Sequence, residues 1–216
     1  MIKDKVRGLL QSLPPGVTLV AATKERSPEQ MIEALESGVS VFGENYIQEA
    51  KDKFAIIGKR VSWHLIGHLQ KNKARQAVAI FDMIETLDSY ELAQVLDKEC
   101  KKINKVMPVL IEINSAAEPQ KKGILIEEAE AFLKELKPFS YLKPRGLMTM
   151  GPFADDPELI RPYFRKIKEL FTQLKKEFDF KYLSMGMSDS YKVAIEEGAN
   201  IIRVGTAIFG ARSSQS

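Results

Sequence analysis

The sequence predicts an α/β protein with one domain, a (β/α)8 TIM barrel that takes in residues 1–216. Eight β-rich runs alternate with amphipathic helical stretches along the chain, which is the element order of a parallel barrel. Several runs are continuously apolar, as expected for parallel strands that are covered on both faces. Neither a linker nor a low-complexity tract divides the 216 residues, a length at the short end of the range for this fold.

The predicted strands are rich in Val, Ile, Leu and aromatic residues. They span residues 17–23, 39–42, 61–66, 83–87, 106–113, 145–149, 182–185 and 201–204. A doubly wound open sheet is the alternative architecture. Eight regular units favour a closed barrel, because closure leaves no exposed edge strand.

Helix start and stop signals lie between these strands. Ser27 and Gln30 have the spacing of a capping box, and Pro28 between them suits the first helical position. An apolar stripe over residues 47–57 predicts the next helix. Asp156 is predicted to open a long helix whose apolar stripe runs to Phe178, and Ser188 is predicted to cap a later helix.

Composition sets limits on function. The net charge of +3 is small and basic residues are mixed with acidic ones, so we expect no dedicated nucleic-acid surface. The N-terminus begins with charged residues, and no apolar run is long enough to span a bilayer, so we expect a cytoplasmic protein without membrane contact. Cys100 is the only cysteine, which excludes an intrachain disulfide.

Candidate site residues gather where the first and last strands end. Lys24 follows the first strand and shares a face with Ala22, so an inward lysine at the rim would become a nucleophile toward carbonyls. The alternative is a surface lysine at a strand end. Arg203 lies in an apolar strand and needs an acceptor, either a ligand atom or an acid on another strand such as Glu112.

Two glycine-containing loops follow the seventh and eighth strands, at residues 184–189 and 205–210. Loops at these two positions form the usual phosphate site of TIM barrels, although either could be an ordinary turn. The two histidines, His64 and His68, lie on or beside a strand without a third ligand, so we expect no metal site. Methionines 148, 150, 185 and 187 cluster at strand ends, where they fill the core or pack against a flat ring.

Six segments of the chain match a known family. They are residues 19–24 (Leu-Val-Ala-Ala-Thr-Lys), 42–46 (Phe-Gly-Glu-Asn-Tyr), 63–73 (Trp-His-Leu-Ile-Gly-His-Leu-Gln-Lys-Asn-Lys), 146–148 (Gly-Leu-Met), 183–188 (Leu-Ser-Met-Gly-Met-Ser) and 203–210 (Arg-Val-Gly-Thr-Ala-Ile-Phe-Gly). On these residues the chain resembles the pyridoxal 5′-phosphate (PLP) homeostasis proteins. The resemblance implies the barrel of the fold-type III PLP enzymes, related to the N-terminal domain of alanine racemase, without the second β-domain of the racemases.

The resemblance also implies roles for individual residues. Lys24 would be the Schiff-base lysine, Asn45 would lie near the cofactor ring, and Arg203 would face the pyridine nitrogen. The phosphate would be held by Ser184, Ser188, Gly205 and Thr206, and His64 and Met148 would be further pocket residues.

The implied function is PLP homeostasis: binding the cofactor as a Schiff base, without catalysis, and passing it to apo PLP-dependent enzymes. An arginine beside the pyridine nitrogen disfavours its protonation and weakens the electron sink on which PLP catalysis depends. We expect a monomer or a weak homodimer. A racemase-like PLP enzyme and a cofactor-free Schiff-base aldolase are the alternatives. A two-base racemase would need a partner to the lysine, and the sequence offers no obvious tyrosine for it, with only Tyr46 left open.

Overall fold

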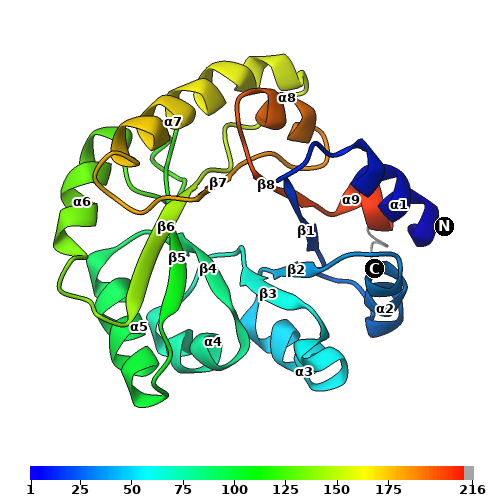
Figure 1. Cartoon of the computed structure of the whole chain (residues 1–216), viewed down its shortest axis with the longest axis horizontal. Coiled ribbons are helices and arrows are strands. Elements are labelled where there is room, and N and C mark those ends of the chain that lie inside the picture. Colours follow the sequence, from blue (N-terminus) through cyan, green and yellow to red (C-terminus); the bar gives the residue numbers. More distant parts are fainter. Residues whose placement is uncertain (212–216) are drawn as a thin grey trace.

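The computed structural model describes residues 1–211, and its strands form one closed, all-parallel barrel in the order β1 to β8 (Figure 1). The strands are β1 (Thr18–Ala22), β2 (Val41–Glu44), β3 (Ser62–Leu65), β4 (Met83–Leu87), β5 (Met107–Glu112), β6 (Leu142–Met148), β7 (Tyr182–Ser184) and β8 (Ile201–Val204). β1 pairs with both β2 and β8, which closes the sheet. The predicted (β/α)8 barrel is confirmed and the open sheet is excluded.

Helices surround the barrel on its outer face (Figure 1). They are α1 (Ile2–Ser12), α2 (Pro28–Glu36), α3 (Ile47–Ile57), α4 (Ala74–Ile80), α5 (Tyr90–Lys102), α6 (Ala129–Glu135), α7 (Arg161–Leu174), α8 (Tyr191–Glu196) and α9 (Thr206–Phe209). Short 3₁₀ helices stand beside four of them: η1 (Gly58–Arg60), η2 (Lys71–Lys73), η3 (Ile126–Glu128) and η4 (Pro157–Ile160). The first and last helices, α1 and α9, lie side by side.

The predicted capping box of α2 is confirmed: the Ser27 hydroxyl accepts the backbone N–H of Gln30, and the Gln30 side chain accepts the N–H of Ser27. Asp156 does cap a helix start, but it opens the 3₁₀ helix η4, and α7 itself ends at Leu174. Phe178 therefore lies beyond the helix in which it was predicted.

The prediction that Ser188 caps α8 is wrong. Ser190 occupies the cap position, without a side-chain cap hydrogen bond. The Ser188 hydroxyl instead accepts the backbone N–H groups of Gly205 and Ala207 from the neighbouring loop. A serine near a helix start can thus bond to donors that are distant in sequence, which helix periodicity does not reveal.

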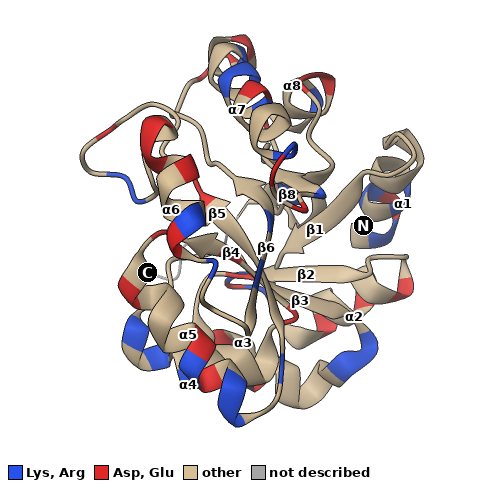
Figure 2. Cartoon of the chain, turned by 60° about the vertical axis from the view of Figure 1, so that its left-hand side comes forward, with Lys and Arg blue, Asp and Glu red and all other residues tan. Residues whose placement is uncertain are grey.

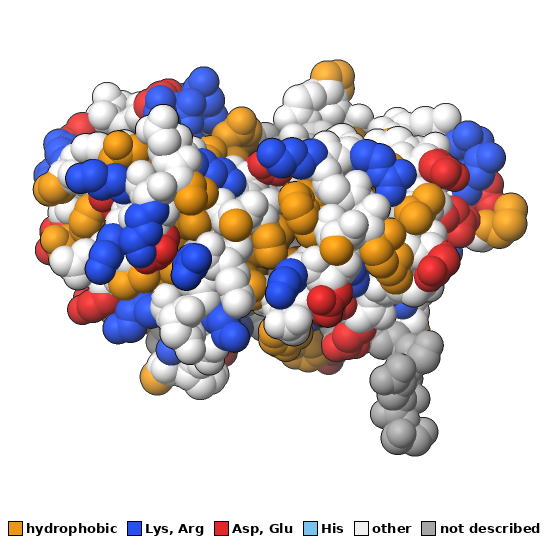
Figure 3. Space-filling view, turned by 90° about the horizontal axis from the view of Figure 1, so that it is seen from below, with side chains coloured by type: hydrophobic (Ala, Val, Ile, Leu, Met, Phe, Trp, Pro, Cys, Tyr) orange, Lys and Arg blue, Asp and Glu red, His pale blue; other side chains and the backbone are white. Residues whose placement is uncertain are grey.

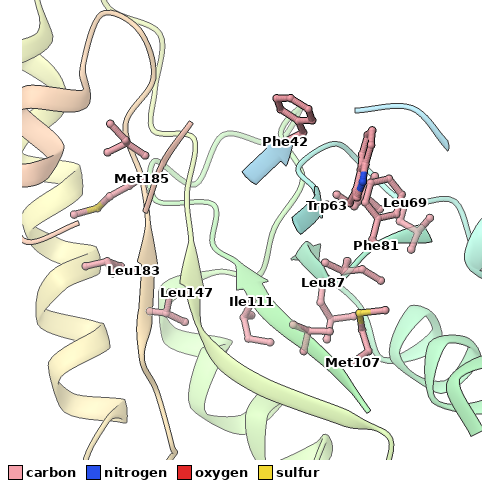
Figure 4. Packing of buried hydrophobic residues seen from close by; sticks show 14 of the residues in the cluster. Phe42, Trp63, Leu69, Phe81, Leu87, Met107, Ile111, Leu147, Leu183 and Met185 are labelled. Atoms are coloured by element: carbon pink, nitrogen blue, oxygen red, sulfur yellow. The ribbon is translucent and has the colours of Figure 1, made fainter. Parts of the chain in front are cut away.

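The apolar core has two layers. A large one fills the space between the strands and the helices, where Phe42, Trp63 and Phe81 pack from neighbouring elements (Figure 4). A small one fills the barrel interior with Val20, Val41, Ile66, Met83, Leu110, Met148 and Ile201. The interior layer forms an apolar floor below the carboxyl ends of the strands, which is where TIM barrels carry their sites.

Residues of both charges are mixed along the outer helices (Figure 2), and side chains of both charges are mixed on the face seen in Figure 3. Within residues 1–211, no helix has the length and apolar character needed to cross a membrane. Burial raises the pKa of the Cys100 thiol to about 11, so this cysteine behaves as a small apolar core residue.

Candidate functional site

A cavity of about 200 Å³ lies at the carboxyl ends of the strands. It is lined by Ala22, Lys24, Arg26, Asn45, Ile66, Met150, Met187, Ser188, Asp189, Arg203, Gly205 and Thr206. The structure therefore brings six of the nine predicted site residues together: Lys24, Asn45, Ser188, Arg203, Gly205 and Thr206. The other three, His64, Met148 and Ser184, are buried in the strands and do not line this cavity.

Lys24 stands in the loop after β1, and Ala22 on the same strand face also lines the cavity. Two residues further on, an Arg26 guanidinium nitrogen donates to the carbonyl oxygen of Gly210 at 2.6 Å. The same guanidinium lies 5.6 Å from the centre of the Phe209 ring. The loop that carries Lys24 is thus bound to the end of α9, which follows the neighbouring strand β8.

Arg203 forms part of the cavity floor and is only 3% exposed. One guanidinium nitrogen donates to the Ser184 hydroxyl at 2.6 Å, and another donates to the carbonyl oxygen of Thr149 at 2.9 Å. Ser184 in turn donates to Glu85 Oε2 at 2.6 Å, and that carboxylate lies 3.9 Å from Arg203. These contacts hold the guanidinium in one orientation.

A ligand atom and an acid on another strand, such as Glu112, were the two acceptors predicted for Arg203, and the acid that lies beside it is Glu85. Glu85 is fully buried, and His64 Nδ1 lies 2.7 Å from its Oε1. Burial alone would raise the pKa of Glu85, but the His64 hydrogen bond and the charges of His64 and Arg203 bring it below its ordinary value. An ionised Glu85 therefore balances the buried guanidinium.

The two predicted phosphate loops meet at Ser188. Its hydroxyl oxygen lies 3.3 Å from the backbone nitrogens of both Gly205 and Ala207. Gly186, in the same loop, has φ +93°, and a Cβ there would lie 2.5 Å from the Ala194 side chain. Only glycine allows the loop to pack this closely against α8. The result is a pair of N–H donors converging at one edge of the cavity.

Comparison with known proteins identifies the family of this chain. The family model for the N-terminal domain of alanine racemase matches residues 1–213. A pyridoxal phosphate homeostasis protein of Aquifex aeolicus (strain VF5) is 40% identical over 197 residues, which cover 90% of this chain and 86% of the relative. The chain belongs to the pyridoxal phosphate homeostasis protein family.

Solved structures extend the family comparison. PipY of Synechococcus elongatus PCC7942, with PLP bound, has a TM-score of 0.90 and 32% identity, and the match covers 97% of this chain and all of PipY. Alanine racemase of Corynebacterium glutamicum matches at 17% identity and a TM-score of 0.80, over 98% of this chain but 60% of the racemase. The racemase likeness therefore concerns the shared barrel fold.

Several residues in or below the cavity were not predicted from the sequence. Arg26 and Asp189 line the cavity, and Glu85 carries the charge below it. A signal for Glu85 was present, because a lone carboxylate in the apolar run Met83–Leu87 requires a buried partner. Sequence provides no comparable signal for Arg26, whose role depends on α9 lying next to β1.

A second hollow of about 370 Å³ lies beside the first and shares Met150 and Met187 with it. Burial and the nearby Asp88 raise the pKa of Glu112, which lines this hollow, to about 7. His68 also lines it, with Nδ1 3.6 Å from an Asp88 oxygen. No group of three or more His, Cys, Asp or Glu with the arrangement of a metal site occurs in the described residues.

Proposed function

We propose that this chain binds PLP on Lys24 in the barrel mouth and acts as a non-catalytic carrier in PLP homeostasis. One observation carries the proposal: an amine, a guanidinium, the Ser188 hydroxyl and the backbone N–H donors of the loop after β8 converge on a single cavity. The homeostasis proteins that match most of the chain, and the PLP-bound PipY structure, support the same cofactor.

The cavity residues suit each functional group of PLP. The N–H groups of Gly205 and Ala207, now bonded to the Ser188 hydroxyl, are donors of the kind that bind a phosphate. Asn45 would lie near the ring, Thr206 and Ser188 would add phosphate contacts, and Arg203 would face the pyridine nitrogen. When bound, PLP supplies an aldehyde that condenses with a primary amine and a ring that withdraws electrons.

The charge at the cavity floor favours a carrier over a catalyst. Arg203 is fixed by Ser184 and Thr149, so it presents a permanent positive charge to the cavity. A fixed cation beside the pyridine nitrogen disfavours protonation of that nitrogen, and an unprotonated ring is a weaker electron sink. Tyr46 is 62% exposed, and no tyrosine of the described residues lines the cavity as a second base.

A carrier of this kind keeps a reactive aldehyde out of solution and releases it to other proteins. We propose apo forms of PLP-dependent enzymes as the recipients and a monomer or weak homodimer as the active form. The cavity mouth is open to such a transfer, since Met150 and Met187 at its edge are 39% and 38% exposed.

The test compares the wild-type protein with Lys24→Ala and with Lys71→Ala, an exposed lysine outside the cavity. Each protein is titrated with PLP and followed by visible absorbance. We expect a yellow band in the wild type and Lys71→Ala that is missing in Lys24→Ala. Borohydride reduction followed by mass spectrometry should locate the cofactor on Lys24.

Two other outcomes contradict the proposal in different ways. A protein that stays colourless in excess PLP does not bind the cofactor, and aldol activity in that protein would favour the aldolase. Racemisation of an amino acid that is lost in Lys24→Ala would instead show a PLP enzyme and contradict the non-catalytic role.

A further inference from the structure

Two side chains of α3 hold the backbone on both sides of Lys24. Lys53 Nζ donates to the carbonyl oxygen of Thr23, the residue before Lys24, at 2.5 Å. Glu49 Oε1 accepts the backbone N–H of Glu25, the residue after Lys24, at 2.5 Å. The two peptide groups that flank Lys24 are therefore bound by side chains one helical turn apart.

The Lys53 ammonium group is fully engaged by three acceptors. Besides the Thr23 carbonyl it donates to Glu44 Oε1 at 2.8 Å and to Glu49 Oε1 at 2.6 Å. An ammonium group has three donors, and the Lys53 side chain is only 6% exposed. Lys53 is thus held as a buried cation in a fixed position, whereas Lys24 lines the cavity.

Glu44 of β2 makes a further contact with Thr23, the residue between β1 and Lys24. Its Oε1 accepts the Thr23 hydroxyl at 2.5 Å as well as the Lys53 ammonium. Its Oε2 is buried and has no hydrogen-bond partner among residues 1–211, so the carboxyl group depends on Thr23 and Lys53 for its stabilisation. A buried group with so few partners keeps its neighbours in place, because any displacement leaves it less satisfied.

The backbone after Lys24 has a conformation that needs such support. Glu25 has φ +58°, in the left-handed region that is unfavourable for residues other than glycine. Such conformations persist where the surrounding structure enforces them, and they gather at functional sites. The Glu49 contact to the Glu25 N–H and the Arg26 contact to Gly210 hold this segment from two sides.

We propose that Lys53, together with Glu49, is the positioning residue for Lys24: it fixes the backbone from which the Lys24 amine reaches into the cavity. The inference rests on the proposed function in that Lys24 is taken as the reacting amine. The two lysines then have different roles. The half-buried Lys24 lines the cavity, and the buried Lys53 donates to three acceptors.

The experiment measures the reactivity of the Lys24 amine without PLP. The protein is labelled with trace acetic anhydride across a range of pH, which transfers an acetyl group to each neutral amine and releases acetate, and mass spectrometry gives the rate at Lys24. The variants are Glu49→Ala, Lys53→Met and Lys53→Arg. Lys51→Met, exposed on the same helix, and Leu174→Ala, buried in α7, are the controls.

We expect the pH profile of Lys24 labelling to shift in Glu49→Ala and Lys53→Met. Capture of added PLP should slow by about tenfold to a hundredfold, the cost of a small misplacement of a reacting group. Lys53→Arg keeps a cation with several donors and should recover part of the loss. Leu174→Ala should lower the stability of the protein without changing any contact of Lys24, so the pH profile of Lys24 labelling should stay unchanged. This control separates an effect on positioning from general destabilisation.

Folded Glu49→Ala and Lys53→Met proteins with a wild-type Lys24 profile would overturn the proposal. If Lys53→Met does not fold, Glu49→Ala decides the matter, because Glu49 is half-buried at 24% exposure and its loss leaves the Lys53–Glu44 pair intact. Failure of the wild type to bind PLP would contradict the proposed function instead, and the acetylation profile would still report on the positioning of Lys24.

Discussion

Glu85 is the residue on which the charge balance of the cavity floor depends. It accepts hydrogen bonds from Ser184 and contacts His64, and its charge faces Arg203. All three of these partners are buried. A buried guanidinium is tolerated only when an anion of this kind compensates it, so Glu85 supports both the fold and the orientation of Arg203.

We expect Glu85→Gln to be destabilising by about 3 to 5 kcal/mol, because the change removes the carboxylate 3.9 Å from the buried Arg203 guanidinium. The measurement is urea unfolding of Glu85→Gln, of Arg203→Gln and of the double variant. The double variant should lose less stability than the sum of the single variants, since it removes both charges. Additive losses would mean that the two side chains do not act as a pair.

At this scale the sequence predicted individual residues better than their contacts. Lys24, Arg203 and the Ser188 and Gly205 loops were found because strand alternation and strand ends fix their location. Ser184 was predicted among the phosphate ligands, and its hydroxyl is instead bonded to Arg203 and Glu85 below the cavity. Its assignment to the phosphate stays a prediction.

At the scale of single elements, β6 shows a feature that periodicity does not reveal. The strand begins at Leu142, earlier than predicted, because Pro144 does not suggest a strand interior. Its register with β5 shifts between the pairs Val109–Pro144 and Leu110–Gly146, so that Arg145 is an extra residue. Gly146 directly after this bulge approaches the β7 backbone closely.

We expect Gly146→Ala to disrupt the pairing of β6 with β7. A Cβ at Gly146 would lie 1.7 Å from the carbonyl oxygen of Tyr182, which only a backbone shift can relieve. The loss in unfolding free energy should be at least about 3 kcal/mol. Gly8→Ala in α1 is the control: nothing lies within 4 Å of its Cβ, and it should gain about 0.5 to 1 kcal/mol.

Thermal or denaturant unfolding of the two glycine variants checks this contrast. Equal stabilities of Gly146→Ala and the wild type would mean that the backbones of β6 and β7 can move apart without loss of stability.

Strand positions were otherwise predicted within a few residues, because closed parallel strands are apolar on both faces. Bulges leave no such pattern, since their cause is the register of two strands.

For the whole molecule, the barrel interior combines an apolar floor with a charged layer above it. The floor is the Val20 to Ile201 cluster, and the layer above contains Glu85, Glu112 and Arg203. Burial lowers the pKa of Arg203, and the charges of Glu85 and Glu112 oppose that shift. These three inward charges come from β4, β5 and β8, so no single segment of the sequence shows them together. Because they interact, the stability of the barrel depends on pH.

Glu112 should make the folded state less stable as the pH rises. Its pKa in the folded protein is raised from 4.5 to about 7, first by burial and then by Asp88. A raised carboxyl pKa contributes stability that is fully present below the unfolded value near 4.5 and is lost as the pH rises through about 7. The difference between these two values corresponds to at most about 3 kcal/mol.

Urea midpoints of the wild type and Glu112→Gln, measured from pH 4 to pH 8, test this sign. The neutral amide cannot ionise, so Glu112→Gln should gain stability relative to the wild type as the pH rises, with most of the change between about pH 5 and pH 7. Glu127→Gln, at an exposed carboxylate, should run parallel to the wild type over the same range. If the difference in urea midpoint between Glu112→Gln and the wild type stays constant with pH, Glu112 is solvated well enough to ionise without loss of stability. The inward charges would then not control how the stability of the barrel depends on pH.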